Sequence, residues 1–436
     1  MKLEQDSGLR LVDISWWVHL GRILLFSLPF LALSLYTAHL GFLTNGHAHI
    51  TAKALLAVDR LRLEVIGFLY PPLPFLLVLV APRPWMPSLL SSLAAGATAW
   101  LLWYDLERIG LGRLWRMLLL VAVAVVPSSL FLATQAFPDM LALHLLAVAW
   151  HYYWNFLRYR HTFSGFIAGL VLGLAFYANF YALLYALAFA LIVPLFRRLD
   201  GEPPEPEEFW ATLSQMLVTA FPALWAILSW SSINWVFTGS PLTYLTDPAA
   251  AVFDPERWNV PLRDRLPWLA AFGLELLAAP LLIGAIVANA RYYPRRVLPL
   301  IVLVLLPTVV RFLGLSFALP LVAATYTLLG VFSLPERLPR WWGPVLVTLA
   351  VLQGVSSAAL ARQAGEVMAW EQVVTSGQSR QSDQQEQQLG DYLRGAPDRT
   401  ILTDDRSAYR IIARAATARP FLLPADAAFA AALDDP

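Results

Sequence analysis

The feature that most constrains this chain is a series of apolar runs, each about twenty residues long, that recurs along most of its 436 positions. In a bilayer such runs become helices, because each backbone amide then finds a partner within its own segment. The segment 119–133, LLVAVAVVPSSLFLA, shows none of the polar–apolar alternation that a membrane β-barrel requires. The sequence therefore predicts an all-α polytopic membrane protein.

Composition excludes several other classes. Hydrophobic residues make up 58% of the chain and charged residues only 14%, whereas about a quarter of a soluble domain is charged. The net charge of +1 gives no reason to expect a nucleic-acid partner. The chain has no cysteine, which excludes disulfides, thiol catalysis and cysteine-ligated metals. The first residues lack the pattern of a cleaved signal peptide, so we expect the first span to anchor the protein.

We predict about eleven transmembrane helices, each long enough to cross the hydrocarbon core. Their residues are 18–40, 86–104, 117–135, 139–157, 163–178, 180–196, 210–236, 267–290, 297–313, 317–333 and 343–360. The stretch 65–82 differs, because Pro71, Pro72 and Pro74 each remove a helix hydrogen bond inside its apolar run. We interpret it as a re-entrant or interfacial segment on the outer side of the membrane.

The basic residues test that interpretation, since Lys and Arg collect in cytoplasmic loops. If 65–82 does not cross, one side receives most of the basic clusters. They are Lys2, Arg10, Arg22, Arg108, Arg113, Arg116, Arg158, Arg160, Arg197, Arg198, Arg291, Arg295, Arg296, Arg337 and Arg340. We therefore expect a cytoplasmic N-terminus and an external C-terminus. The abundance of Ala, Leu, Arg and Pro suggests a bacterial inner or plasma membrane.

The chain divides into a transmembrane domain, residues 1–360, and a small α/β tail outside the membrane, residues 361–436. The tail begins with a polar, glutamine-rich stretch. Residues 399–416 then predict a strand followed by a helix, with Asp404 or Asp405 as the helix N-cap. A unit of this size cannot bury much core. We therefore expect the tail to pack on the transmembrane domain or to remain loose.

An ordered set of segments runs along this topology. It comprises TNGHAHITAKALL (44–56), YPPLPFLL (70–77), LERIGLGR (106–113), QAFPDMLALHLLAV (135–148), SSINWVFTGSPLTYL (231–245) and ILTDDRSAYRIIA in the tail. Their order and spacing resemble the GT-C superfamily of polytopic glycosyltransferases, near its aminoarabinose- and mannosyltransferase branches. The resemblance implies transfer of a sugar, on the outer face of the membrane, from a polyprenyl-phosphate-linked donor to an acceptor.

The resemblance also implies a carboxylate at the outer membrane boundary. Asp139, which opens the fourth predicted span, is the candidate; alternatively it only satisfies the free amides at a helix N-terminus. Family members usually carry an aspartate in the first outer loop, where this sequence has Asn45, whose amide cannot take up a proton. Either His47 or His49 then replaces that aspartate, or Asp59 swings into its place, or the protein is not a transferase.

We predict that His47 and His49 lie in a polar loop, where an extended backbone would direct both side chains to one side. With Asp139 they would supply three ligands, which leaves a divalent metal open as a cofactor beside direct proton transfer. The alternative is that both are solvated loop residues.

Arginines near the outer face are the candidates for contacting a donor phosphate, because guanidinium groups form paired hydrogen bonds with phosphate oxygens. Arg60 and Arg62 precede the YPPL string, Tyr70 begins it, and Arg311 lies between two predicted spans. The alternatives are an interfacial helix with a solvated face for the first two, and an arginine that reaches to the membrane surface for Arg311.

Three functions remain open from the sequence. The first is the glycosyltransferase. The second is a GT-C-shaped scaffold that has lost its acid and binds a lipid or a membrane protein partner. The asparagine at position 45 supports this second function. The third is a transporter or flippase, which would require charged residues at mid-membrane. The predicted spans hold almost none except Glu275, so this possibility ranks last.

Overall fold

The computed structural model describes most of the chain. The described ranges are 16–159, 161–198, 206–247, 279–312, 318–336, 338–339, 341–361, 364–424 and 426–434, with single positions between 260 and 276. The described part is helical apart from two short strands in the tail. The prediction of an all-α fold is confirmed, and the two short strands lie in the predicted tail.

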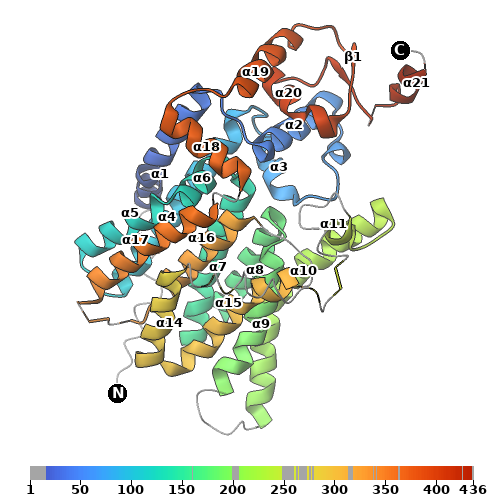
Figure 1. The fold of residues 1–436 in the computed structure, drawn as a ribbon. Coiled ribbons are helices and arrows are strands. Elements are labelled where there is room, and N and C mark those ends of the chain that lie inside the picture. Colours follow the sequence, from blue (N-terminus) through green and yellow to red (C-terminus); the bar gives the residue numbers. More distant parts are fainter. Residues whose placement is uncertain are drawn as a thin grey trace.

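Most predicted spans correspond to one helix each, arranged as a bundle (Figure 1). These helices are α1 (Trp16–His39), α4 (Trp85–Arg108), α7 (Phe137–Tyr159), α8 (Thr162–Ala178), α9 (Ala182–Arg198), α10 (Pro206–Thr238), α15 (Val297–Phe312), α16 (Leu319–Phe332) and α17 (Trp342–Ala361). The predicted span 267–290 is represented by α14 (Pro280–Tyr292), and most of its first half lies outside the described residues. Small residues permit close packing: a side chain at Gly96 in α4 would collide with Ser27 in α1.

Three of the described helices are long and apolar enough to cross a membrane by themselves: α1, Phe209–Thr238 within α10, and Trp342–Ala359 within α17. At 1.5 Å per residue, α4 and α7 are also about 35 Å long; α4 carries charged residues near its C-terminal end and α7 carries them near both ends. Several other apolar helices are shorter than eighteen residues. The chain thus has the long apolar helices of a membrane protein, and the count of eleven spans stays a prediction.

The predicted span 117–135 is broken by a bend, and whether it crosses the membrane stays a prediction. It is divided between α5 (Arg113–Ala124) and α6 (Pro127–Gln135), whose axes differ by 74°. Val126 is extended, as residues before proline tend to be, and Pro127 then occupies the first turn of α6.

The stretch 65–82 is irregular, as its prolines predicted. It contains a short 3-10 helix, η1 (Leu63–Ile66), and the seven-residue helix α3 (Pro72–Val78). A helix of seven residues is about 10 Å long, which is far too short to cross the hydrocarbon core. Helix α3 packs against α2, α7 and α8.

The expected polar loop around the two histidines is a helix, α2 (Asn45–Arg60), so that prediction is wrong. Thr44 is its N-cap, since its hydroxyl oxygen accepts a hydrogen bond from the His47 amide, and the alanine-rich sequence that follows favours helix. Residues two apart on a helix point about 200° apart. His47 and His49 therefore face different neighbours.

The tail contains α18 (Gly365–Ser376), α19 (Gln381–Leu393), β1 (Ile401–Leu402), α20 (Asp405–Ala415), β2 (Phe421–Leu422) and α21 (Phe429–Asp434). The two strands pair in parallel, and Asp404 is the N-cap of α20, which confirms that part of the sequence prediction. Helix α20 packs on α2, so the tail covers α2 rather than hanging loose (Figure 1).

Ion pairs hold the tail on α2. The Arg60 guanidinium donates to the Asp426 carboxylate at 2.7 Å and 3.0 Å, and also to the Phe421 carbonyl oxygen at 2.6 Å. Two turns earlier along α2, the Lys53 ammonium lies 2.6 Å from the Asp405 carboxylate. Both pairs are largely shielded from solvent, so salt screens them less than it screens exposed pairs.

Candidate functional site

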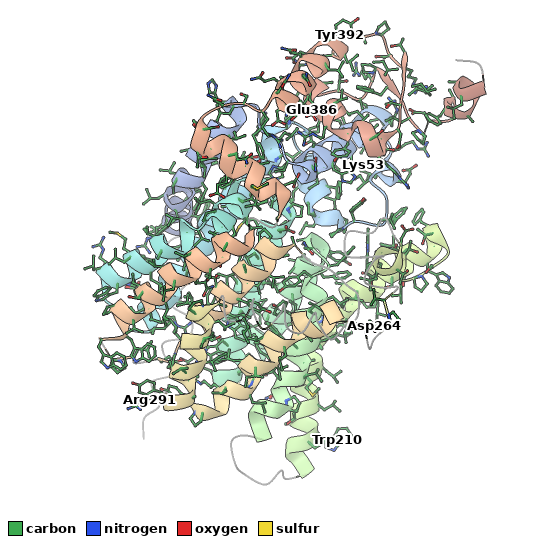
Figure 2. All side chains as sticks on the ribbon, viewed as in Figure 1. Lys53, Trp210, Asp264, Arg291, Glu386 and Tyr392 are labelled. Carbon is green, nitrogen blue, oxygen red and sulfur yellow. The ribbon has the colours of Figure 1, made fainter. Side chains whose placement is uncertain are left out.

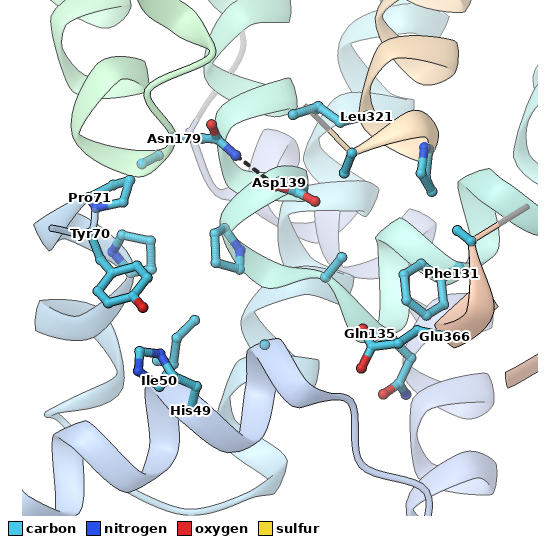
Figure 3. A pocket seen from close by; sticks show the side chains of 18 of the residues that line it. His49, Ile50, Tyr70, Pro71, Phe131, Gln135, Asp139, Asn179, Leu321 and Glu366 are labelled. Atoms are coloured by element: carbon cyan, nitrogen blue, oxygen red, sulfur yellow. Dashed lines mark hydrogen bonds between the residues drawn. The ribbon is translucent and has the colours of Figure 1, made fainter. Parts of the chain in front are cut away.

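A cavity of about 450 Å³ lies where the membrane bundle meets the tail (Figure 3). Its wall is formed by α2, the turn before α3, the α6–α7 junction, the end of α8, and the first residues of α16 and α18. Most of that wall is apolar. The described polar and ionisable side chains that line it and could bind or react with a ligand are those of His49, Tyr70, Gln135, Asp139, Asn179 and Glu366.

Asp139 lies in the first turn of α7, where the helix dipole favours a negative charge. The Asn179 side-chain amide, just after α8, donates a 2.7 Å hydrogen bond to Asp139 Oδ1. Asn179 is itself fixed, because its own Oδ1 accepts from the Tyr181 amide at 2.9 Å. Within the described chain this is the one hydrogen bond that the Asp139 carboxylate accepts, so it retains oxygen lone pairs for a ligand.

His49 faces the cavity among aromatic rings. Its ring centroid lies 4.8 Å from that of Tyr70, 6.0 Å from that of Phe75 and 5.8 Å from that of Tyr409 in the tail. Burial, with a contribution from the charge of Lys53, lowers the pKa of His49 to about 4. The imidazole is therefore neutral at pH 7 and offers a hydrogen bond or a flat surface rather than a charge.

His47 does not line the cavity, contrary to its predicted place beside His49. It is fully buried, and its Nε2 accepts a 3.0 Å hydrogen bond from the Phe137 amide at the start of α7. Its Nδ1 lies 3.2 Å from Ser88 Oγ in α4. Burial lowers the pKa of His47 to about 3, so the ring is neutral. His47 caps the helix on which Asp139 lies.

Asn45 forms hydrogen bonds with two residues of the tail. Its side-chain oxygen accepts a 2.9 Å hydrogen bond from Arg410, and its backbone amide donates to Glu366 Oε1 at 2.8 Å. A carboxylate therefore does lie at the start of α2, but it comes from α18. Sequence reasoning missed Glu366; the available signal was its position directly after the last predicted span, at the same boundary as Asp139.

The predicted donor-binding residues have different surroundings. Tyr70 lines the cavity. The Arg60 guanidinium forms an ion pair with Asp426 and is not available to a phosphate in this structure. Arg62 is exposed and pairs with Glu64 at 2.8 Å, outside the cavity lining. Arg311 belongs to the last turn of α15, and its side chain lies outside the described residues.

The set of Asp139, His47 and His49 that would hold a divalent metal does not form, because His47 points away toward Ser88 and Phe137. Across the described residues there is no group of three or more histidine and acidic side chains that could hold a metal ion. The chemistry that the cavity offers is that of carboxylates, amides and one neutral imidazole.

Comparison of the chain with known protein families, with curated proteins and with solved structures finds no match.

Proposed function

We propose that this protein is a GT-C-like membrane glycosyltransferase that moves a sugar from a polyprenyl-phosphate donor to an acceptor. The observation that carries the proposal is Asp139: a carboxylate with free lone pairs, held in the wall of a 450 Å³ cavity where the membrane helices meet the tail. Acids at such depth are costly and are retained for function more often than for packing.

The cavity suits a substrate with an apolar chain and a polar head. Phe131 of α6 and Leu321 of α16 bring apolar surface from the membrane bundle, while His49 of α2 and Glu366 of α18 bring polar groups from the face that the tail covers. A lipid-linked sugar and an acceptor entering from water can meet only at such a boundary.

In the proposed reaction Asp139 is the general base. It takes the proton of an acceptor hydroxyl group, and the acceptor oxygen attacks the anomeric carbon of the donor sugar. The bond from that carbon to the phosphate oxygen breaks, and polyprenyl phosphate leaves with the electron pair. The Asn179 amide holds Asp139 in place without competing for its second oxygen. Arg311, at the end of α15, is the remaining basic candidate for the leaving phosphate.

The proposal includes the orientation inferred from sequence, with about eleven spans. The packing of α20 on α2 puts the tail and the first predicted outer segment on one face. Figure 2 shows Arg291 and Trp210 at the end of the molecule opposite Lys53, Glu386 and Tyr392. In the proposed orientation the end with Arg291 is cytoplasmic and the tail is external.

A second candidate function is a non-catalytic scaffold that binds a lipid or a membrane protein. Two observations favour it. Asn45, where the family resemblance implies an acid, is engaged by Arg410. In addition, the described lining of the cavity contains no lysine or arginine to meet a phosphate.

The test is transfer in membranes that contain the full chain. Radiolabelled polyprenyl-phosphate hexoses and pentoses are supplied, and both labelled product and released polyprenyl phosphate are measured. Asp139→Asn keeps the volume and removes the base, so we expect transfer to fall by about 10²–10⁴-fold. Asp398→Asn, an exposed acid of the tail, is the matched control. Full activity of Asp139→Asn would exclude this site, and no turnover of any donor by the unchanged protein would favour the scaffold.

A further inference from the structure

The cavity has a second carboxylate, and it comes from the tail. Glu366 lies in the first turn of α18, and its Oε1 accepts a 2.8 Å hydrogen bond from the Asn45 amide in the first turn of α2. Two helix N-termini thus converge on one carboxylate. In the described chain that bond is the one hydrogen bond that Glu366 accepts, so Oε2 remains available.

Gln135 adds another acceptor on the same side of the cavity, where α18 packs against α6. Its Nε2 donates to Thr37 Oγ1 at 2.9 Å. The network fixes that orientation, because the Thr37 hydroxyl hydrogen is directed to the backbone carbonyls of Leu33 and Ser34, so Thr37 can only accept from Gln135. The Gln135 side-chain oxygen is therefore left as an acceptor.

The polar lining of the cavity is consequently rich in acceptors. Asp139, Glu366 and Gln135 all present oxygen atoms, while the Asn179 amide already donates to Asp139 and the Gln135 amide already donates to Thr37. The matching ligand is one that donates several hydrogen bonds without adding negative charge. A ring that carries several hydroxyl groups has this property, and hydrogen bonds from hydroxyls to a carboxylate are among the stronger ones.

We infer that Glu366 is a specificity-determining residue that binds hydroxyl groups of the sugar or acceptor ring, so that the site is complete only when the tail is docked. The inference deepens the proposed function and rests on it. Glu366 binds the ring, whereas Asp139 carries out the proton transfer.

The docking contacts support a composite site. Arg410 of α20 donates to the Leu43 carbonyl oxygen at 2.8 Å and to Asn45 Oδ1, directly beside the amide that holds Glu366. It also pairs with Asp383 and Glu386 of α19, each at 2.8 Å. The tail is thus braced against the start of α2, where Glu366 enters the cavity.

The first experiment measures ligand binding without turnover. The full chain is purified in detergent, and a panel of methyl glycosides is titrated by saturation-transfer NMR. Glu366→Gln preserves shape and can still accept from the Asn45 amide, so we expect it to fold with an unchanged melting temperature. We expect its affinity for the bound glycoside to fall about tenfold, which is the range for losing one charge-assisted hydrogen bond. Asp398→Asn should bind like the unchanged protein.

The second experiment separates binding from chemistry. In the transfer assay, Glu366→Gln should raise KM about tenfold and change kcat by less than about threefold, because it removes binding common to ground and transition states. Asp139→Asn should lower kcat instead. An unchanged affinity and KM in Glu366→Gln would overturn the inference, and so would the absence of glycoside binding to the unchanged protein. Glycoside binding that depends on Glu366, without any transfer, would support the inference and reject only the proposed transferase.

Discussion

The buried His47 allows a sharp test, because sequence and structure assign it different roles. As a catalytic residue it would be dispensable for folding. In the structure its Nε2 accepts from the Phe137 amide, and its ring is completely buried among α2, α4 and α7. His47→Ala leaves that amide unpaired, at about 1–3 kcal/mol, and removes a packed ring, at about 2 kcal/mol.

The sum for His47→Ala is about 3–5 kcal/mol of unfolding free energy. At roughly 2 °C per kcal/mol for a large chain, the melting temperature should fall by about 6–10 °C. The measurement is thermal unfolding of the full chain in detergent, followed by intrinsic fluorescence.

His47→Gln is the companion variant, since a glutamine side chain can place an oxygen near the position of Nε2. It should recover about half of the loss, because one hydrogen bond is restored and part of the packing is not. Two outcomes would contradict a capping role of His47 on α7. One is a melting temperature of His47→Ala within about 1 °C of that of the unchanged protein; the other is a melting temperature of His47→Gln no higher than that of His47→Ala. Loss of transfer with full stability in both would return His47 to a catalytic role.

Two further predictions concern pH and topology. His47 and His49 have folded-state pKa values of about 3 and about 4, below the ordinary value of about 6.5, so the unfolded chain binds protons first as the pH falls. The free energy of unfolding should therefore be constant above about pH 6.5 and decline below it, by up to about 1.4 kcal/mol per pH unit for each histidine. His47→Gln should reduce that slope. A melting temperature that is equal at pH 5 and pH 7 would contradict the predicted decline. An epitope tag after residue 434 should be cleaved by protease added to intact spheroplasts, and protection of the tag until lysis would reverse the proposed orientation.

Apolar runs were sufficient to locate most helices, since a long run has no other stable state in a bilayer. They were not sufficient to locate breaks. Pro29, Pro194 and Pro222 lie inside α1, α9 and α10, whereas Pro127 separates α5 from α6 by a bend of 74°. The same residue type is tolerated in three helices and ends another, so the outcome depends on packing around it. Local sequence does not encode that packing.

The histidine pair was misjudged for a different reason. Thr44, Asn45 and Gly46 look like a loop, and the capping role of Thr44 becomes visible only once the following alanines are known to continue as a helix. The error in local structure then became an error about the site, because a helix separates His47 from His49 where an extended chain would have put them together. Asp139 was located correctly at a helix N-terminus because that prediction needed only the start of an apolar run.

The basic residues show what sequence alone could not decide. Arg60 looks like a phosphate ligand when only its neighbours along the chain are considered. Its partner Asp426 lies in the tail, hundreds of residues away, and the same long-range packing brings Glu366 to the start of α2. Tail docking therefore pairs one cation on the face that the tail covers and adds one carboxylate to the cavity. Both changes shift the described site from binding anions toward binding groups that donate hydrogen bonds, which is why the tail belongs to the proposed site.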